Sequence, residues 1–561
     1  MTLKNNRKWN IKHRVDDINN ILSLILKDRG INDIDRFLNP RIEDIPSYKK
    51  LYNVKKAVKE IVHSISNDEK IYIHGDFDVD GISASAILWQ FIYQDLAKHI
   101  NKKIDILPYI PDRVDEGYGL SRSSLDNMIS NGAQLIITVD CGVRDRELIE
   151  EYIENNNLNI IITDHHQPPD DISDVKYTIV HQMFPNKEFV EQKICGSAVI
   201  YFLIQALIEE YKMNENKLYG IDLVGLATVT DMMPLVGLNR IFVKYAIEEI
   251  KKGNRLGLKK LINISGVNEK EFDSYHMGFI VGPRINAAGR IGSAMEALRL
   301  LASNNNILTN ELSSKLNNLN VLRQENTKEI LDKALEQYEN QKNNKIFIAI
   351  GDNWHEGIIG LVAGKIFEKI NKPTIVITRS KKGELKGSAR SISSFNITQA
   401  LDKNKKYLDK YGGHAQAAGF TLSENNLDQF IPSLVKYANK KITDDMLIKE
   451  LVIDIELDIK DINIDTYNIL EKLKPFGYGN NRPLIAIHNV RVLDKYIMKG
   501  NQHMKLKVGS NEYSISAVMF NCDEDINIIN VGDNISISGY IDINKWNNNT
   551  YIQLQVKEYS V

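Results

Sequence analysis

In the first half of the chain, short apolar runs end directly in acidic side chains. The runs KIYIH, AQLIITV and LNIIIT lead into Asp76 and Asp78, into Asp140, and into Asp164, respectively. A fourth run, VKYTIV, follows, and helical stretches separate the runs. Apolar runs of this length that alternate with helices predict an α/β fold with a parallel sheet. Because ligands bind at the carboxyl ends of strands in open sheets of this kind, these acids are expected to converge on a site.

The rest of the chain predicts three further parts. Residues 306–342 keep a helical period without Gly or Pro, which predicts a long connector helix. A second, smaller α/β pattern follows, with KIFIAIGD and PTIVITRS as strands around the helix GIIGLVAGKIFEKI. Six short strand-like runs then predict a C-terminal β-barrel of oligonucleotide-binding (OB) type. The expected domains are an N-terminal segment (1–50), the domain that carries the acids (51–305), the connector helix (306–342), the second α/β domain (343–445) and the barrel (446–561).

Composition limits the expected partners and location. The formal net charge is −2 over 561 residues, so there is no global basic field, and nucleic acid would have to be bound by local patches. No run approaches the roughly 20 apolar residues that a membrane span needs. The three cysteines lie far apart and predict neither a disulfide framework nor a CxxC zinc site. We therefore expect a cytoplasmic protein with no membrane partner.

The stretch DFDVDG could open a calcium-binding EF-hand loop. With Asp76 as the first position, the sixth is Gly81, as an EF-hand requires, but the twelfth is Ile87 instead of the bidentate Glu. A strand, not a helix, is predicted before it. These two departures exclude the EF-hand.

A solvated acidic turn and a metal site remain as interpretations of this stretch. In the first, Asp80 would cap the helix that follows, because a carboxylate is favoured at a helix N-terminus. In the second, His74, Asp76 and Asp78 would share one face of an extended chain and form half of a metal site. Further candidate ligands stand in three downstream motifs: Asp140, Asp164, His165, His166 and Asp231.

Each downstream residue taken alone is more often a strand-end cap or a satisfied core group. Together, presented at the ends of four apolar elements, they favour a metal site. Mixed imidazole and carboxylate ligands suit Mn²⁺ or a similar ion better than calcium. The acids and histidines exceed what one ion needs, so two ions are expected. Such a pair, about 3.5–4 Å apart, can serve phosphoryl transfer.

Basic residues for a phosphate occur in two Gly-containing motifs. GPRINAAGRIG offers Arg284 and Arg290 in a predicted Gly-rich loop whose backbone amides could face an anion, and the alternative is a turn with surface arginines. KGSAR and GGHAQAAG place Ser388, Arg390 and His414 beside glycines, which allow close approach to a ligand or merely form tight turns.

The motifs HGDFDVDG, VDCG, TDHHQ and ATVTDMMPL resemble, in order and context, the four motifs of the DHH phosphoesterase superfamily. That superfamily is named for its Asp-His-His sequence, here Asp164-His165-His166. GPRINAAGRIG, GSARS and YGGHAQAAGF continue the match, and the last two resemble its DHH-associated domain. LKPFGYGNNRP and the strand-rich tail resemble the third domain of bacterial single-strand-specific exonucleases. Phe77 and Lys386 depart from the common pattern, but neither departure removes a ligand.

The resemblance implies a 5′-to-3′ exonuclease that hydrolyses single-stranded DNA to 5′-mononucleotides in recombination and repair, with two Mn²⁺ or Mg²⁺ ions per site. The implied metal ligands are His74, Asp76, Asp78, Asp140, His165 and Asp231, of which Asp78 and Asp140 would bridge both ions. The implied catalytic residues are Asp76, Asp78, Asp140, His165 and His166, supported by Asp80 and Asp164. The implied substrate-binding residues are Arg284, Asn286, Arg290, Ser388, Arg390 and His414. Implied partners are a helicase and a single-strand binding protein, and a monomer is expected.

Two other functions stay open from the sequence. A DHH enzyme for short substrates, such as an oligoribonuclease or a cyclic-dinucleotide phosphodiesterase, would share the first two domains but lack the barrel. A catalytically silent DNA-binding scaffold would have lost its ligands, whereas every expected Asp and His is present here.

Overall fold

The computed structural model describes residues 8–169, 172, 175–183, 189, 193–379, 383–498, 500, 502–510, 512–522, 525–547 and 549–560. The chain divides into two compact units. Unit 1 contains the chain up to Ile34, Thr327–Lys474 and the chain from Asn481 onward, and unit 2 contains Asp35–Asn326 and Pro475–Asn480. Within the described part of the chain, no helix combines the length and the apolar character that crossing a membrane requires.

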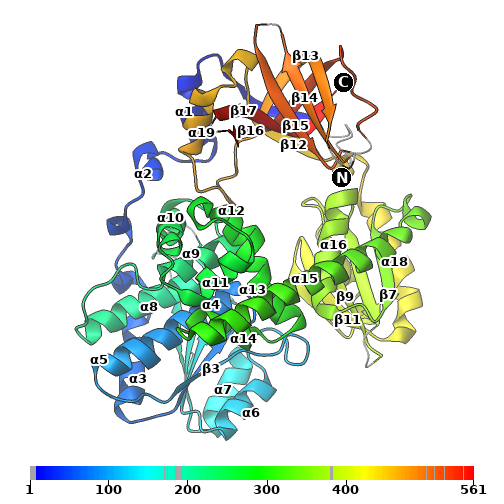
Figure 1. The fold of residues 1–561 in the computed structure, drawn as a ribbon. Coiled ribbons are helices and arrows are strands. Elements are labelled where there is room, and N and C mark those ends of the chain that lie inside the picture. The colour runs from blue at the N-terminus through cyan, green and yellow to red at the C-terminus, as the bar shows by residue number, and fades with distance from the viewer. Residues whose placement is uncertain are drawn as a thin grey trace. The chain divides into compact units, whose positions relative to one another are not determined.

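Unit 2 is built on a five-stranded parallel sheet in the order β3-β2-β4-β5-β6 (Figure 1). The strands are β2 (Ile71–Gly75), β3 (Ile106–Tyr109), β4 (Leu135–Val139), β5 (Asn159–Asp164) and β6 (Thr178–His181). From β2 the chain goes to β3 on one side and then back to β4 on the other, so the strand order reverses between β2 and β4. Ligands bind at such a switch point in doubly wound sheets. The four strands predicted from the sequence are all present, and β3 is an additional edge strand.

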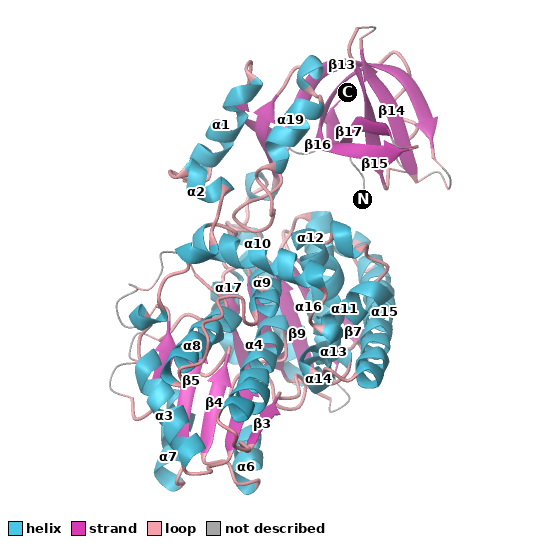
Figure 2. Ribbon diagram, turned by 60° about the vertical axis from the view of Figure 1, so that its left-hand side comes forward, coloured by secondary structure: helices cyan, strands magenta, loops and turns pink. Residues whose placement is uncertain are grey.

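Helices cover both faces of this sheet (Figure 2). One face packs against α3 (Val54–Ser66), α4 (Val79–Gln90) and α8 (Gly196–Glu210), and the other against α6 (Arg122–Ser130) and α7 (Arg146–Asn155). Successive strand residues therefore alternate between two cores: Ile71 and Ile73 belong to the first, and Tyr72 to the second. The continuous apolar runs of the sequence follow from this double coverage.

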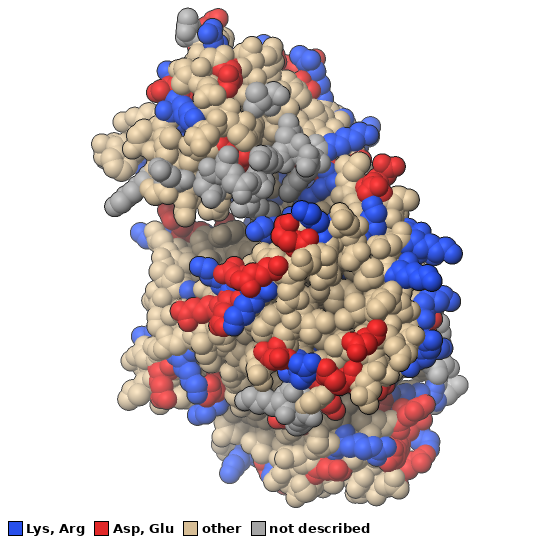
Figure 3. All heavy atoms as spheres, turned by 90° about the vertical axis from the view of Figure 1, so that its right-hand side faces the viewer, with Lys and Arg blue, Asp and Glu red and all other residues tan. Residues whose placement is uncertain are grey.

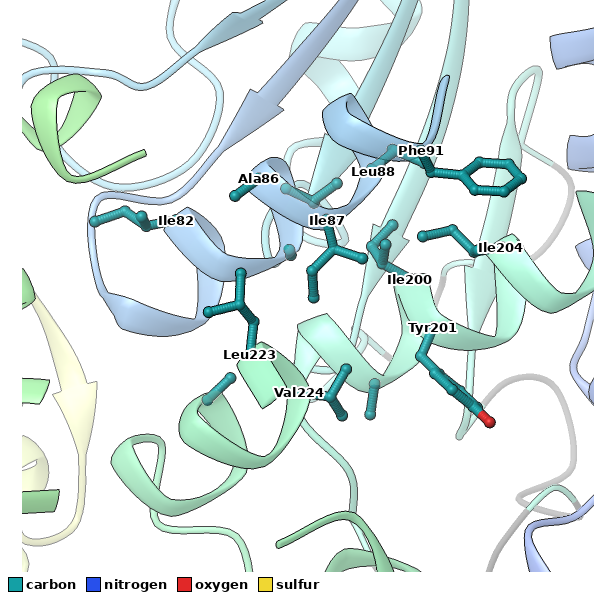
Figure 4. Close-up of a cluster of buried hydrophobic side chains, with 14 of the residues drawn as sticks. Ile82, Ala86, Ile87, Leu88, Phe91, Ile200, Tyr201, Ile204, Leu223 and Val224 are labelled. Atoms are coloured by element: carbon teal, nitrogen blue, oxygen red, sulfur yellow. The ribbon is translucent and has the colours of Figure 1, made fainter. Parts of the chain in front are cut away.

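The helices α4, α8 and α9 (Ile221–Thr230) form the centre of the larger core (Figure 4). Ten of the twelve residues of α4 and twelve of the fifteen of α8 are buried, which is typical of helices surrounded by other elements. Ile87 of α4 lies among Ile200 of α8 and Val224 of α9. Each large apolar side chain buried in this way contributes about 1.5–3 kcal/mol. The N-terminus of α4, which carries the acidic motif, is thus held by a rigid core.

The remainder of unit 2 is helical. It comprises α2 (Ile34–Leu38), α5 (Ala97–His99), α10 (Gly237–Lys252), α11 (Leu256–Ile264), α12 (Ser274–His276), α13 (Gly282–Ile291) and α14 (Ala294–Ala302). GPRINAAGRI was predicted to be a Gly-rich loop, and this prediction was wrong: it forms α13. Pro283 stands in the first turn, where proline is favoured, and Ala287 and Ala288 are buried.

The helix α15 (Asn306–Glu336) leads from unit 2 into unit 1, where the predicted connector helix was expected. It is followed by the sheet β10-β11-β9-β8-β7, in which only β7 and β8 are parallel. The elements are β7 (Phe347–Asp352), α16 (Glu356–Ile370), β8 (Thr374–Arg379), β9 (Leu385–Arg390), α17 (Ile397–Lys403), β10 (Lys410–His414), β11 (Ala417–Leu422) and α18 (Leu427–Lys441).

The C-terminal part of unit 1 is a closed barrel. Its strands pair in the order β13-β14-β15-β17-β16, and β16 pairs back with β13. The barrel strands are β13 (Ile485–Ile497), β14 (His503–Gly509), β15 (Ser514–Phe520), β16 (Asn534–Trp546) and β17 (Asn549–Ser560). β12 (Glu450–Glu456) and the N-terminal β1 (Lys8–Arg14) extend the sheet beside β13, and α1 (Ile21–Asp28) and α19 (Ile464–Glu471) complete this part. The predicted α/β, connector, α/β and OB-barrel architecture is confirmed. The predicted residue limits of the domains stay a prediction.

Candidate active site

The acidic motif lies at the carboxyl end of β2, beside the switch point. The strand ends at Gly75, so the face-sharing expected of an extended chain does not extend from His74 to Asp76 and Asp78. Instead the chain turns, and Asp78 is the N-cap of α4: its Oδ1 accepts hydrogen bonds from the backbone N–H of Asp80 (2.9 Å) and Gly81 (3.2 Å). The expectation that Asp80 caps this helix is therefore corrected, because Asp78 satisfies the free N–H groups.

Asp80 caps a different helix. Its Oδ2 accepts the N–H of Gly196 at 2.6 Å and its Oδ1 the N–H of Ser197 at 2.7 Å, at the start of α8. The carboxylate is almost completely buried, and the positive end of the α8 dipole stabilises its charge. Asp80 thus joins two central helices of the core and fixes the orientation of the acidic motif.

Asp140 follows β4 in a backbone conformation that side chains rarely adopt. Its φ is +64°, in the left-handed region, which Asp tolerates better than most residues. The backbone of Gly196 lies so close that a Cβ there would stand 2.8 Å from the Asp140 Cβ, which explains the glycine. Strained conformations of this kind occur where a side chain must be aimed precisely.

The Asp164-His165-His166 motif ends β5. Both carboxylate oxygens of Asp164 have hydrogen-bond partners. Oδ1 accepts the backbone N–H of His165 (2.7 Å) and of His166 (3.1 Å) and lies 2.8 Å from His166 Nδ1. Oδ2 accepts the backbone N–H of Val143 at 3.0 Å. Burial by itself would raise the pKa of Asp164, but the hydrogen bond and charge of His166 hold it well below its ordinary value. Asp164 therefore orients both histidines and has no free oxygen directed elsewhere.

These motifs bring the potential ligands together in three overlapping clusters. In each cluster the ligand atoms all lie within 4.8 Å of one another: Asp76, Asp78 and Asp140; Asp140, His165 and His166; and Asp80, His165 and Asp231. His165 Nε2 lies 3.0 Å from Asp140 Oδ1, 3.5 Å from Asp231 Oδ2 and 3.7 Å from Asp80 Oδ2. Asp140 and His165 are each shared by two clusters, so the three form one continuous site.

The same residues carry buried polar atoms that have no hydrogen-bond partner. Among the described residues these include Asp76 Oδ1, Asp140 Oδ1, His165 Nε2 and Asp231 Oδ2, and also His74 Nε2. A buried polar atom without a partner costs about 1–3 kcal/mol. All four atoms of this site can offer a lone pair when His165 is neutral with its proton on Nδ1, and such atoms are the ligands that a divalent cation needs. The residues present therefore fit a metal site.

The protonation equilibria agree with that fit. Burial, together with the charges of neighbouring carboxylates, raises the pKa of Asp76, Asp78 and Asp140, and raises the pKa of Asp231 to about 9. Burial lowers the pKa of His165. Without cations the acids would take up protons to relieve their repulsion, and bound cations would do the same by coordination.

His74 lies apart from the three clusters found among the described residues. It is fully buried at the end of β2, its ring stacks on Tyr109 at 5.6 Å, and its Nδ1 is 3.5 Å from Cys141 Sγ. Burial lowers its pKa to about 4, so the ring is neutral and its Nε2 is able to coordinate. Its assignment as a ligand stays a prediction, as do the other residue roles.

The sequence analysis missed two polar residues of this site, Arg113 and Tyr118. The Arg113 guanidinium stacks 3.8 Å from the centre of the Phe77 ring, and its Nε donates to the Gly289 carbonyl at 2.9 Å. Burial lowers its pKa, against the attraction of Asp76 and Asp78. The Tyr118 hydroxyl lies 3.0 Å from His166 Nδ1 and 3.3 Å from the Asp140 carbonyl. Both stand in the loop PDRVDEGYGL, whose only sequence signal is its pair of glycines around Tyr118.

The predicted phosphate-binding residues of unit 2 are distributed over α13. Asn286 and Arg290 are four positions apart and share a face, whereas Arg284 points elsewhere. Arg284 Nε donates to Asn317 Oδ1 at 3.0 Å, and its Nη1 donates to the Ile280 carbonyl at 2.7 Å. Burial lowers the pKa of Arg284, and burial together with the charge of Arg284 lowers the pKa of Arg323. Two arginines that repel each other favour an anion nearby.

The predicted residues of the second domain meet on one sheet of unit 1. Ser388 and Arg390 are two positions apart on β9 and therefore share a face. Arg390 pairs with Ala417 of β11, which pairs with His414 of β10, so His414 points to the same face. Burial lowers the pKa of Arg390, whose Nη1 donates to the Ala389 carbonyl at 2.9 Å.

Family models match three parts of the chain. The DHH family N-terminal domain matches residues 70–228, the DHHA1 domain matches residues 322–440, and the RecJ OB domain matches residues 453–558. The first match contains the acidic and Asp-His-His motifs, the second contains Ser388, Arg390 and His414, and the third covers the barrel.

Curated relatives match along nearly the whole chain. The single-stranded-DNA-specific exonuclease RecJ of Bacillus subtilis is 32% identical over 550 residues, which are 96% of this chain and 68% of that protein. The protein of the same name from Escherichia coli is 27% identical and is matched over 95% of this chain and 94% of its own.

Solved structures agree in fold. RecJ of Thermus thermophilus in complex with Mn²⁺ has a TM-score of 0.84 at 24% identity, over 99% of this chain and 80% of that one. A structure of exonuclease RecJ bound to manganese has a TM-score of 0.62 at 30% identity, over 71% of this chain and 97% of that one. With its DHH, DHHA1 and RecJ OB domains in this order, the chain belongs to the RecJ family of single-stranded-DNA-specific exonucleases.

Proposed function

We propose that this protein is a metal-dependent exonuclease that degrades single-stranded DNA from its 5′ end to 5′-mononucleotides in recombination and repair. The observation that carries the proposal is the convergence of buried, unpartnered carboxylate and imidazole atoms at the switch point of the parallel sheet. Such a donor set suits Mn²⁺ or Mg²⁺. Both relatives of known structure described above were solved with manganese.

The cluster geometry supports roles for individual residues. Asp76, Asp78, Asp140, His165 and Asp231 would hold two cations, and Asp140 is shared by two of the ligand clusters. Two cations so placed supply Lewis-acid chemistry for phosphodiester hydrolysis. The carboxylate oxygens of Asp80 and Asp164 accept hydrogen bonds from backbone N–H groups. The two residues would therefore keep the ligands in position.

His166 is suited to the phosphate. Burial opposes its charge, but the hydrogen bond and charge of Asp164 and the charges of Asp231 and Asp80 raise its pKa to about 9. A histidine that keeps its proton at neutral pH, 39% exposed and beside Asp140, can donate to a phosphate oxygen. We place Tyr118 in the same donor set because its hydroxyl contacts His166.

Binding of the strand must rely on local groups. The net charge is −2, and Figure 3 shows positive and negative side chains interspersed on the face that it displays. Ser388, Arg390 and His414 on one sheet face offer donors for a terminal phosphate. The barrel presents exposed aromatic rings, among them Tyr496 (65% exposed) and Trp546 (68% exposed). Stacking on such rings stabilises single strands by roughly 1–3 kcal/mol per base and tolerates any sequence.

The cellular setting is proposed from the same resemblance. We place the protein in the cytoplasm, in keeping with three buried cysteines that form no disulfide. It would act as a monomer beside a helicase that separates strands and a single-strand binding protein that covers them.

The test is a length and strandedness series. Oligonucleotides labelled at the 5′ end, single-stranded or as blunt duplexes, are incubated with and without Mn²⁺. We expect labelled mononucleotide from single strands only, and only with the metal. Turnover of dinucleotides without turnover of long strands would instead indicate a short-substrate phosphodiesterase, and binding of the strand without turnover would indicate a silent scaffold.

A further inference from the structure

A short segment late in the sequence, Pro475–Asn480, belongs to unit 2, although the chain on both sides of it belongs to unit 1. It is closed on itself: Gly477 and Asn480 exchange two backbone hydrogen bonds of 3.0 Å. The fully buried Asn480 also donates its Nδ2–H to the Pro475 carbonyl at 2.8 Å. The segment is therefore a preformed loop.

This loop packs against the turn that carries Asp231. The Tyr478 carbonyl accepts the N–H of Leu235 at 2.8 Å. A Cβ at Gly479 would stand 2.9 Å from Pro234 Cβ, and a Cβ at Gly477 would stand 2.5 Å from Leu235 Cδ1. The two glycines thus allow the loop to approach the turn more closely than any other residue could.

The loop is anchored on its other side as well. Ser274 Oγ, at the start of α12, donates to the Phe476 carbonyl at 2.6 Å. Arg240 of α10, almost completely buried, donates to the Pro475 carbonyl at 3.4 Å while its guanidinium stacks 3.9 Å from the centre of the Phe37 ring. The loop is therefore fixed to two helices and to the turn between α9 and α10.

Without this contact, the turn 231–236 would not be held in its present conformation. Asp231 follows the last residue of α9, and Met232 next to it has a φ of +54°, a conformation that costs a side-chain-bearing residue about 1–2 kcal/mol. Asp231 Oδ2 stands beside the Asp80 and His165 cluster without a hydrogen-bond partner. Relief of this backbone strain would move Asp231 away from the cluster.

We propose that the loop Pro475–Asn480 is a positioning device for the metal site: by holding the turn 231–236 it keeps the Asp231 carboxylate opposite His165. The inference rests on the proposed metal-dependent function. It adds that a segment from beyond the second domain is part of the catalytic unit, so that a unit cut before residue 475 would lack it.

The test uses substitutions in the full-length protein. Gly479→Ala forces the Pro234 backbone to move and adds strain at a φ of +72°. Gly266→Ala is the matched control, because Gly266 lies in the same unit with a φ of +76° and nothing within 4 Å of its Cβ position. Gly477→Ala is the milder second variant, since it displaces only the flexible end of Leu235. Asp231→Asn serves as the reference for loss of the carboxylate.

Mn²⁺ binding is measured directly, from the electron paramagnetic resonance signal of free Mn²⁺, alongside thermal unfolding and exonuclease turnover. We expect Gly479→Ala to weaken Mn²⁺ binding roughly tenfold, as losses of groups that support metal ligands do, and Gly477→Ala to weaken it less. Gly266→Ala should bind Mn²⁺ as the wild type does, although it too loses thermal stability.

Wild-type Mn²⁺ affinity in both loop variants would overturn the inference and leave the proposed function standing. If Gly479→Ala does not fold, Gly477→Ala decides in the same way. Absence of Mn²⁺ binding and of turnover in the wild type would overturn the proposed function and the inference together.

Discussion

The Nε2 atom of His165 lies 3.0 Å from Oδ1 of Asp140, and neither atom has a hydrogen-bond partner. The two residues directly follow the neighbouring strands β4 and β5, and each is shared by two ligand clusters. Burial lowers the pKa of His165, and burial together with the charges of neighbouring carboxylates raises the pKa of Asp140. Two buried ligand atoms this close together, neither of them with a hydrogen-bond partner, suit a shared cation.

Asp140→Asn should abolish both Mn²⁺ binding and hydrolysis while leaving single-strand binding in place. Asn tolerates the left-handed φ of +64° and has nearly the same shape, so the fold is kept while the charge is lost. Turnover, Mn²⁺ titration and strand-binding assays check the three parts separately. Asp68→Asn is the control, because Asp68 also has a positive φ (+58°) but is exposed on the same unit. Residual turnover comparable to wild type in Asp140→Asn would contradict the metal assignment.

Removal of metal should make stability fall as pH rises. The pKa of Asp231 is raised to about 9 from 3.8, so the folded metal-free protein binds a proton that the unfolded chain releases. The stability that this bound proton of Asp231 contributes is fully present below pH 3.8 and is lost as pH rises through about 9. The pKa values of Asp76 and Asp140 are raised as well. Thermal unfolding in a chelator at several pH values measures the effect.

Two comparisons sharpen this prediction. Saturating Mn²⁺ should remove most of the pH dependence, because the cations replace the protons, and Asp231→Asn should remove part of it in the chelator. A midpoint of unfolding in the chelator that stays level or rises with pH over this range would contradict the prediction.

Much of the architecture can be predicted from the sequence, because strands that are buried on both faces of a sheet appear as continuous apolar runs. These runs predicted β2, β4, β5 and β6. The edge strand β3 was not predicted, because it is only four residues long and contains Pro108. For α13 the three glycines of GPRINAAGRIG suggested a loop. Gly282 and Gly289 are tolerated in the helix because close packing compensates for their low propensity: the Phe77 carbonyl oxygen would lie 2.2 Å from a Cβ at Gly289.

The sequence allowed us to predict which residues form the site, but not all of the contacts that hold them in place. The clustering of Asp76, Asp140 and His165 follows from strand ends that meet at a switch point, which strand order alone determines. The capping of α8 by Asp80 could not be foreseen, since it joins residues more than 110 positions apart. Arg113 and Tyr118 lie in an irregular loop, where no periodicity shows which way a side chain points.

The edge strand β7 is protected by two glutamines from the end of the connector. Gln337 donates to the Ile350 carbonyl (2.8 Å) and accepts its N–H (3.0 Å), and Gln341 does the same with Ile348 (2.8 and 3.3 Å). The double variant Gln337→Ala/Gln341→Ala should lower the free energy of unfolding of unit 1 by about 1–3 kcal/mol, because four partly buried backbone groups lose their partners. Chemical denaturation measures this. Gln429→Ala, at an exposed position of α18 in the same unit, should change nothing, and an equal loss there would refute the edge interpretation.

Arg390→Gln should raise the KM for single-stranded DNA with a 5′-phosphate by roughly tenfold and leave Mn²⁺ binding unchanged, since one charge-assisted contact of about 1.5–3 kcal/mol is lost outside the metal site. The effect should shrink on strands with a 5′-hydroxyl, because the partner of the guanidinium is then missing. Arg379→Gln on β8 of the same sheet is the matched control: Arg379 is already paired with Asp352 and Glu424, and exposed pairs of this kind contribute little. Initial rates on the two kinds of strand measure the difference. Equal KM values for Arg390→Gln and Arg379→Gln on phosphorylated strands would show that this sheet face does not hold the terminal phosphate.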